Sequence, residues 1–279
     1  MVHPVIELED VSYTYPDGTD ALNRISIRID EGESAAIAGP NGAGKSTLLL
    51  IMAGLVAPSS GEVRIFGRKI GKKDIGRAES MSDIRKRMGI VFQDADTQLF
   101  SATVYDDVAF GPMHLGIGED EVDEMVKSTL EFLGITHLSE RHPYDLSGGE
   151  KRKAAIATAL VSSPDVLLLD EPTADLDPKN RREFVELLKK LKEDGKTIVI
   201  ATHEMDILPE VVERMIVLNG EIVREGSIGE VMLDEKLLER ANLDVPVVTR
   251  LFKLLKNSDD IPLTVEEAIG RIKEMVGDK

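Results

Sequence analysis

A glycine-rich segment, GPNGAGKST at Gly39–Thr47, has the residue types and spacing that bind a triphosphate. Its glycines let backbone N–H groups turn inward, and a helix that follows directs its positive N-terminus at the anion. In the pattern G-x-x-x-x-G-K-[ST], the lysine, here Lys45, reaches the β- and γ-phosphates, and the hydroxyl of Ser46 holds Mg²⁺. The segment therefore predicts a nucleotide site. The expected contacts are Gly39, Pro40, Asn41, Gly42, Ala43, Gly44, Lys45, Ser46 and Thr47.

Two carboxylates follow an apolar run in Val166–Glu171. Such a run is typical of a buried strand, and acidic residues after it are often only a solvent-facing loop. At the carboxyl end of a parallel strand beside a phosphate loop, however, one carboxylate can bind Mg²⁺ and the next can deprotonate the attacking water. We expect Asp170 to be the metal ligand and Glu171 to be the base.

A third polar cluster, Leu146–Glu150, opens a helix expected to run to about Val161. Ser147 supplies a hydroxyl, and Gly148 and Gly149 add backbone N–H groups at the positive end of the helix. Taken alone, such a start is usually a helix cap. Its occurrence together with the loop and the two carboxylates favours a second anion contact.

The elements before and after the loop must position these groups. Val5–Tyr15 and Arg24–Ile29 alternate apolar and polar residues on either side of a Pro16-Asp17-Gly18 turn, which predicts an antiparallel hairpin. The order strand, loop, helix is the one that a phosphate site requires. The expected elements are a strand over Ser34–Ala38, a helix over Lys45–Gly54 and a strand over Glu62–Phe66.

The rest of the chain predicts an α/β fold. Strand signals fade between about Asp94 and Leu160, where a helical stripe over Glu119–Leu133 indicates a helical insertion. Apolar strands then alternate with helices, which predicts a mostly parallel sheet covered on both faces, and Asn219-Gly220 predicts a hairpin turn. The expected strands are Val166–Leu169, Thr197–Ala201, Met215–Leu218 and Glu221–Arg224; the expected helices are an exposed one over Lys179–Glu193 and short amphipathic ones over Gly229–Ala241, Pro246–Lys256 and Val265–Val276.

Composition limits the classes of function. Acidic residues outnumber basic ones 51 to 34, and the formal charge of −17 repels nucleic acid. The absence of cysteine excludes disulfides, thiolate metal sites and a cysteine nucleophile. The longest uncharged run, Ser46–Gly61, is too short and too polar to cross a bilayer, which needs about 20 apolar residues. We expect no nucleic-acid partner, no secretory signal and a cytoplasmic location.

The order of these motifs over Val5–Gly226 resembles the ATP-binding subunits of ABC transporters. The resemblance identifies Gly39–Thr47 with the Walker A loop, VLLLDEP with the Walker B strand, and LSGGE with the family signature, usually LSGGQ. It implies a P-loop NTPase core with a mostly parallel sheet, an N-terminal antiparallel β subdomain, a helical signature subdomain and a small helical C-terminal extension. It implies an ATP-binding domain over residues 1–228, with the helical subdomain at about 94–162, and an extension over residues 229–279.

The same resemblance implies further site residues. Gln93 corresponds to the Q-loop glutamine that touches Mg²⁺ and the membrane subunits. Asp177 lies in the D-loop, and His203 corresponds to the histidine that contacts the γ-phosphate. Tyr15, or alternatively Tyr13, corresponds to the aromatic residue that stacks on adenine.

A head-to-tail dimer is also implied, in which each ATP lies between the Walker A loop of one subunit and the signature of the other. Glu150 stands where the family usually has glutamine, but the contacts expected from Ser147, Gly148 and Gly149 remain. The expected partner is therefore a second ATPase subunit, either another copy or a paralogue. The expected cofactors are ATP and Mg²⁺.

Within the family, Phe92–Pro112 is similar to the ATPases of energy-coupling-factor importers, above all the cobalt importer ATPase. This implies an ATP hydrolase, peripheral on the cytoplasmic face of the cell membrane, which works with integral transport subunits to take up a metal ion (cobalt or nickel) or a vitamin. Leu99, Phe100 and Val104 would form an apolar docking patch for a membrane subunit, and the C-terminal helices would add dimer contacts. Two alternatives stay open: a soluble ABC-type ATPase acting on DNA or the ribosome, and an ATP-switched adaptor without turnover.

Overall fold

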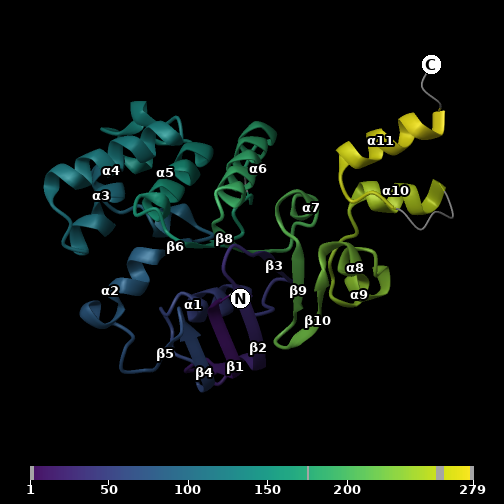
Figure 1. Cartoon of the computed structure of the whole chain (residues 1–279), viewed down its shortest axis with the longest axis horizontal. Helices are drawn as coiled ribbons and strands as arrows, with labels where there is room; N and C mark the ends of the chain where they lie inside the picture. The colour runs from purple at the N-terminus through teal and green to yellow at the C-terminus, as the bar shows by residue number, and fades with distance from the viewer. Residues whose placement is uncertain (1–2, 175, 256–260, 277–279) are drawn as a thin grey trace.

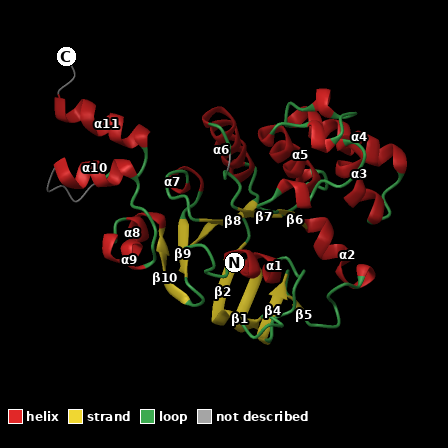
Figure 2. Ribbon diagram, turned by 180° about the vertical axis from the view of Figure 1, so that it is seen from behind, coloured by secondary structure: helices red, strands yellow, loops and turns green. Residues whose placement is uncertain are grey.

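Two β-sheets form the body of the molecule, and helices cover them (Figure 1, Figure 2). The computed structural model describes residues 3–174, 176–255 and 261–276. In these ranges a six-stranded sheet has the order β10-β9-β3-β8-β7-β6, and a four-stranded sheet has the order β2-β1-β4-β5. The strands are β1 (Pro4–Thr14), β2 (Asp20–Asp30), β3 (Ser34–Ala38), β4 (Ser60–Ile65), β5 (Arg68–Ile70), β6 (Met88–Val91), β7 (Val166–Asp170), β8 (Thr197–Thr202), β9 (Arg214–Leu218) and β10 (Ile222–Ser227).

The four-stranded sheet is antiparallel and contains the predicted N-terminal hairpin of β1 and β2. The alternation along β2 buries Ile25, Ile27 and Ile29 on one face. These side chains share a core with helix α1 (Lys45–Met52) and with one face of the larger sheet. The small sheet therefore packs against the helix that carries Lys45.

The six-stranded sheet brings three chemistry-bearing strand ends to one edge. Strands β3, β8 and β7 are parallel neighbours, and β10 pairs antiparallel with β9. Parallel strands present their carboxyl ends at the same edge, where ligands of open α/β sheets bind. Gly39 follows β3, His203 follows β8 and Glu171 follows β7. The strand order thus assembles residues that are far apart in the sequence.

A helical lobe lies beyond the β6 edge of the larger sheet (Figure 1). Its core includes Val108, Val126 and Leu130, and α5 also packs on the sheet through Ile156. The predicted helical insertion is present. The helices from α2 to α7 are α2 (Ala78–Arg87), α3 (Val104–His114), α4 (Glu119–Phe132), α5 (Gly148–Leu160), α6 (Pro178–Glu193) and α7 (Leu208–Val211).

Two predicted helices differ in detail from the structure. The expectation that the helix over 179–193 is exposed is wrong for one of its faces, because Phe184 and Leu188 of α6 are buried against the sheet. The expectation of one helix over 229–241 is also wrong. Asp234 leaves the helical conformation and accepts a hydrogen bond from the backbone N–H of Leu237, which ends α8 (Ile228–Met232) and begins α9 (Glu235–Arg240).

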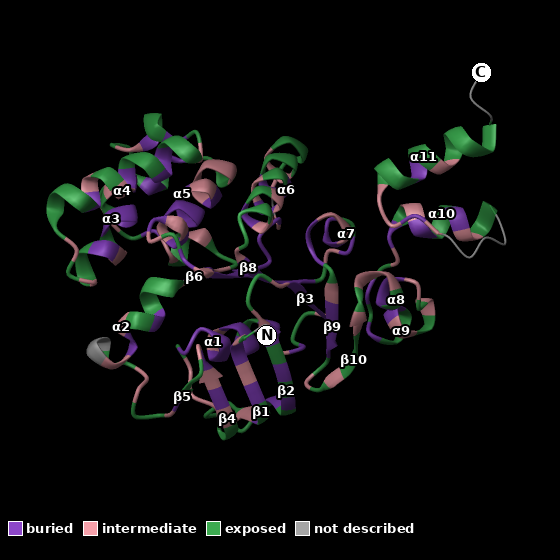
Figure 3. Cartoon of the chain, viewed as in Figure 1, coloured by how far each residue is buried: buried purple, intermediate pink, exposed green. Residues whose placement is uncertain are grey.

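The C-terminal segment has a packed part and a projecting part. Helices α8 and α9 bury Val231, Met232 and Leu238 in the core of the large sheet. Helices α10 (Val247–Leu255) and α11 (Val265–Val276) project from the body, and Figure 3 shows exposed residues along much of both. Lys256, the predicted end of the penultimate helix, lies outside the described residues. Among the described residues, no helix combines the length and the apolar composition that crossing a bilayer requires.

Candidate nucleotide site

The predicted phosphate loop joins β3 to α1, and its shape depends on glycine. Gly42 and Gly44 have φ angles of 82° and 94°, in the left-handed region that favours glycine. A Cβ on Gly44 would lie 2.5 Å from the carbonyl oxygen of Ala21, so a side chain has no room there. Lys45 is buried, and its Nζ donates a hydrogen bond of 2.8 Å to the carbonyl oxygen of Gly39. The ammonium group therefore already lies inside the curve of the loop.

The turn between β9 and β10 anchors this loop from the side. The backbone N–H of Gly220 donates to the carbonyl oxygen of Ala43 at 3.0 Å, and its own carbonyl oxygen accepts from Asn23 at 2.7 Å. A Cβ on Gly39 would lie 2.2 Å from the carbonyl oxygen of Leu218. The loop is thus held between the small sheet and the last hairpin of the large one.

Glu171 is the centre of a hydrogen-bond network at the end of β7. Its Oε1 lies 2.8 Å from Nδ1 of His203 and 3.3 Å from Nζ of Lys45, and its Oε2 accepts a 2.7 Å hydrogen bond from Thr202. Burial favours the neutral acid, but the hydrogen bonds from His203 and Thr202 and the charge of Lys45 outweigh it and lower the pKa of Glu171. Its φ of 42° is a strained value for a residue with a Cβ. An ionised, fixed carboxylate of this kind can accept a proton.

Asp170 is buried beside the loop and keeps a free oxygen. Its Oδ1 has no hydrogen-bond partner among the described residues, whereas the hydroxyl of Ser46 hydrogen-bonds the same carboxylate. Burial and the neighbouring charge of Glu171 raise the pKa of Asp170, although the Ser46 hydrogen bond opposes them. An orphaned carboxylate oxygen next to a hydroxyl provides the oxygen ligands that Mg²⁺ prefers. These residues therefore fit the predicted metal.

Tyr15 flanks the loop at the end of β1. Its ring is exposed, and its hydroxyl lies 2.6 Å from Oγ1 of Thr47 in α1. Tyr13 is partly buried against the core and meets the Tyr15 ring edge-on, with centroids 5.1 Å apart. Of the two tyrosines, Tyr15 is the one that presents an exposed ring beside the loop.

The predicted second anion contact lies at the start of α5. Ser147 caps the helix, because its hydroxyl accepts a hydrogen bond from the backbone N–H of Glu150. The carboxylate of Glu150 in turn accepts hydrogen bonds from the backbone N–H and the hydroxyl of Ser147, both at 2.8 Å. Gly149 faces α6, where a Cβ would lie 2.4 Å from Nδ2 of Asn180. Asn180 in turn donates to Asp177, which caps α6. In the described ranges, no hydrogen bond or ion pair joins the residues 147–149 to the loop at 39–47.

Comparison with known proteins places the chain in a family. The sequence profile of the ABC transporter family matches residues 22–174. The chain belongs to this family. It is 44% identical over 277 residues to the energy-coupling factor transporter ATP-binding protein EcfA of Methanothermobacter thermautotrophicus, covering 98% of this chain and 88% of that protein. It is 40% identical over 273 residues to the protein of the same name from Methanocaldococcus jannaschii, covering 98% of this chain and 96% of that protein.

Solved structures of ABC ATPases agree with this assignment. The structure of cbiO1 from Clostridium perfringens, part of the ABC transporter complex cbiONQ, has a TM-score of 0.73 and 39% identity, covering 90% of this chain and 99% of that one. A dimeric ATP-binding cassette in a post-hydrolysis state, bound to ADP and phosphate, has a TM-score of 0.72 and 34% identity, covering 80% and 98%. The predicted family, its energy-coupling-factor branch, the fold and the ATP hydrolase activity are therefore confirmed.

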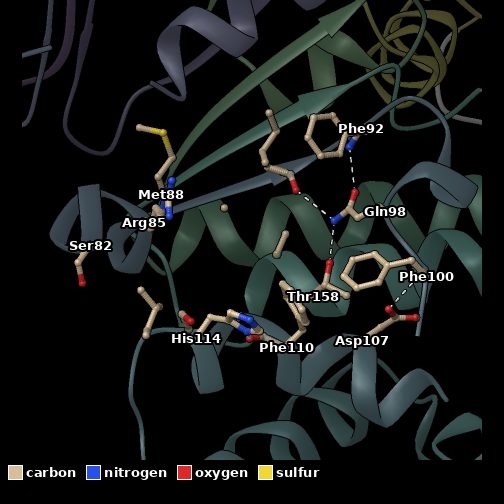
Figure 4. A pocket seen from close by; sticks show the side chains of 16 residues that line it. Ser82, Arg85, Met88, Phe92, Gln98, Phe100, Asp107, Phe110, His114 and Thr158 are labelled. Carbon is tan, nitrogen blue, oxygen red and sulfur yellow. Dashed lines mark hydrogen bonds between the residues drawn. The ribbon is translucent and has the colours of Figure 1, made fainter. Parts of the chain in front are cut away.

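This ABC ATPase has a groove of about 500 Å³ between β6 and the helical lobe (Figure 4). Gln98 binds both sides of it: its Oε1 accepts from the backbone N–H of Phe92 at 3.1 Å, and its Nε2 donates to Oγ1 of Thr158 at 2.7 Å. Phe100 and Phe110 add an apolar wall, with ring centroids 4.9 Å apart in an edge-to-face contact.

The predicted apolar docking patch is wrong at two of its three residues. Leu99 and Val104 are buried, because they pack in the core of the helical lobe. Phe100 is 63% exposed, and the exposed apolar surface continues through Phe110 and Met113 instead.

Gln93 lies on the loop after β6 with its side chain exposed. Within the described part of the chain, no hydrogen bond joins that side chain to Ser46 or Asp170, so its predicted place at the metal stays a prediction.

Sequence reasoning missed Thr202 and Arg152, which both contact Glu171. Nothing in the apolar strand TIVIAT distinguishes its last threonine. Arg152 did carry a signal, because it falls on the buried stripe of α5 together with Ala155 and Ile156, and an arginine on such a stripe requires internal partners.

Proposed function

We propose that this ABC ATPase is the motor of a membrane importer, in which binding of Mg-ATP closes a dimer and hydrolysis reopens it. The observation that carries the proposal is that the chain holds a built phosphate loop around Lys45 and a separate capped helix at Ser147 that does not contact it. A nucleotide bound between two chains would contact the phosphate loop of one chain and the capped helix of the other. ATP can drive closure only because it binds the closed dimer better than the open one.

The residues around Glu171 supply the proposed chemistry. Glu171 accepts a proton from the attacking water, Lys45 binds the β- and γ-phosphates, and His203 contacts the γ-phosphate. The Nζ of Lys45 and the Nδ1 of His203 both contact the carboxylate of Glu171 in this structure. ATP therefore has to draw Lys45 away from Glu171, which frees the carboxylate as the nucleotide enters. Tyr15 stacks on adenine, since its ring is exposed beside the loop.

In this proposal Ser46, Asp170 and Gln93 would hold Mg²⁺. When bound, the ion neutralises charge on the phosphates. The described residues contain no group of three or more histidine, aspartate or glutamate side chains placed to hold a metal, so phosphate oxygens and water complete the ligand set.

The second subunit completes the site. Ser147, Gly148 and Gly149 contact the γ-phosphate bound to the partner, and Asp177 lies at the same interface because Asn180 connects it to Gly149. The chain carries every motif that two copies would need, so a homodimer is sufficient, and a paralogue can replace one copy.

The groove lined by Phe92, Gln98, Phe100 and Phe110 is the proposed contact with the integral membrane subunit. An exposed apolar surface of this kind is typical of a protein interface. The ATPase is then peripheral on the cytoplasmic face of the membrane. The proposed solute is a small one, a metal ion such as cobalt or nickel, or a vitamin. This part of the proposal rests on the resemblance of Phe92–Pro112 to the ATPases of energy-coupling-factor importers.

Affinity capture of the tagged chain from detergent-solubilised native membranes tests the proposal, with mass spectrometry of the recovered proteins. We expect the parent chain to recover a polytopic membrane protein and Phe110→Asp to lose it while still binding ATP. Phe132→Asp is the matched control, because Phe132 has the same exposed fraction of 42% but lies outside the groove.

The outcomes separate the candidate functions. The capture is repeated with Glu171→Gln and ATP. If both captures recover ribosomal or DNA-associated proteins instead, the assignment as an ATPase stands and the assignment as an importer is overturned. Stoichiometric ATP binding without phosphate release would favour an adaptor. A substrate-binding subunit recovered with the membrane protein would identify the class of solute.

A further inference from the structure

Arg152 in α5 connects the groove to the nucleotide site. Its side chain is buried. Nη1 donates a 2.7 Å hydrogen bond to the carbonyl oxygen of Phe92, and Nη2 donates to the carbonyl oxygens of Gln93 at 2.9 Å and Glu171 at 3.1 Å. Phe92 lines the groove, and Glu171 is the proposed base. One guanidinium group therefore touches both the groove segment and the backbone of the base.

The groove segment, residues 92–98, is attached to α5 at further points. Lys151 forms a 2.6 Å ion pair with Asp96, and Gln98 donates to the carbonyl oxygen of Ala155 and to Thr158. These contacts hold the segment to the helix that begins at the signature. Among these α5 side chains, in the described part of the chain, Arg152 is the one that also donates a hydrogen bond to Glu171, the residue after β7.

The chemistry of arginine suits this position. A guanidinium is planar and presents its donors in a fixed fork, so the positions of its acceptors are geometrically linked. Glu171 has a strained φ of 42°, and such a conformation persists only when the surroundings determine it. The hydrogen bond from Arg152 to its carbonyl oxygen is one of those determinants. A shift of the groove segment must therefore either carry the guanidinium with it or break this bond.

We propose that Arg152 is a positioning residue that sets the backbone orientation of Glu171 according to the position of the groove segment, and that kcat for ATP hydrolysis depends on this link. This inference rests on the proposed assignment of Glu171 as the base. It adds a defined physical link between the docking groove and the carboxylate.

Steady-state ATP hydrolysis by the full chain tests this link. Arg152→Met keeps the length of the side chain without its donors, and we expect kcat to fall about 10- to 100-fold while KM for ATP changes less than about threefold. Arg152→Lys keeps the charge and should recover part of the loss. Lys153→Met is the matched control, because Lys153 lies on the same helix but pairs with Glu183 in α6; its kcat should stay within about twofold.

A distance measurement separates positioning from general destabilisation. Because the chain has no cysteine, spin labels at Thr97→Cys and Glu31→Cys, both exposed positions, report the groove segment against the core. We expect one narrow distance distribution in the parent and a broader one with Arg152→Met. If Arg152→Met does not fold, Arg152→Lys carries both measurements.

The inference is overturned if Arg152→Met retains parental kcat, or if kcat and ATP affinity fall together with thermal stability. Glu171→Gln is measured alongside. If Glu171→Gln hydrolyses ATP at the parental rate, Glu171 is not the base, and the inference about Arg152 falls with that assignment. An inactive Glu171→Gln beside a fully active Arg152→Met would overturn the role of Arg152 alone.

Discussion

Thr202 holds the proposed base through a side chain that is fully buried. Its hydroxyl donates to Oε2 of Glu171 and accepts from the backbone N–H of Glu204 at 3.0 Å. A hydroxyl in this position fixes the direction of the carboxylate and favours its ionised form. The carboxylate of the proposed base thus depends on a residue that the sequence motifs did not single out.

We expect Thr202→Val to lower kcat for ATP about tenfold with little change in ATP affinity, because the isosteric valine removes the donor and leaves the carboxylate less constrained. The pKa of Glu171 should rise, since this hydrogen bond is among the contacts that lower it. Thr202→Ser retains the hydroxyl and serves as the control. Steady-state hydrolysis and equilibrium ATP binding check the prediction, and equal kcat values for the two variants would contradict it.

At the scale of elements, two helices begin with the same capping box. Ser147 with Glu150 caps α5, and Ser227 with Glu230 caps α8, which lies outside the site. Hydrogen bonds from the serine backbone and hydroxyl lower the pKa of each glutamate. Because the folded pKa is lowered, each cap contributes fully above the ordinary glutamate pKa and loses its contribution as the pH falls through the lowered value.

The two caps provide a matched pair of variants. We expect Ser147→Ala and Ser227→Ala each to lower the free energy of unfolding by about 1 kcal/mol, which denaturant titration measures. If Ser147 also binds the nucleotide of the partner subunit, Ser147→Ala alone should reduce ATP turnover. Equal turnover in both variants would show that the hydroxyl of Ser147 is a cap and nothing more.

The sequence could predict those elements whose signals are local. The alternation in β2 and the glycine-rich turn before Lys45 both depend on neighbouring residues, and the structure contains the predicted strand and a helix that begins at Lys45. The burial of Leu99 and Val104 could not be read from the sequence, because it depends on the packing of three helices against one another. Helix α2 was missed since its composition is strongly polar. The break at Asp234 was missed because a cap inside an amphipathic stretch does not interrupt the apolar pattern.

At the scale of the whole molecule, α10 and α11 leave apolar residues uncovered. Leu254 is 83% exposed, and Leu251 and Leu255 of the same helix are exposed with it. Apolar surface on two projecting helices is typical of an interface. We infer that these helices contact the second ATPase subunit.

Leu254→Asp should therefore weaken the dimer that Glu171→Gln forms with ATP, raising its dissociation constant about tenfold, because a charge replaces buried apolar contact. Val223→Asp, at an exposed valine in β10, is the control. Sedimentation velocity over a range of chain concentrations measures the effect. An unchanged dissociation constant for Leu254→Asp would remove α10 from the interface, and ATP binding by the monomer should be the same in all three chains.

The order of strands in the large sheet also constrains how the protein is made. Strand β8 is synthesised after β3 and β7, yet it lies between them, and the turn at Gly220 that anchors the phosphate loop comes later still. A nascent chain emerging from the ribosome therefore carries the phosphate loop and Glu171 before the strand that joins β3 to β7 has been made. We therefore expect cellular ATP to stabilise the protein only after translation has passed the hairpin of β9 and β10, because Gly220 in that hairpin holds the phosphate loop.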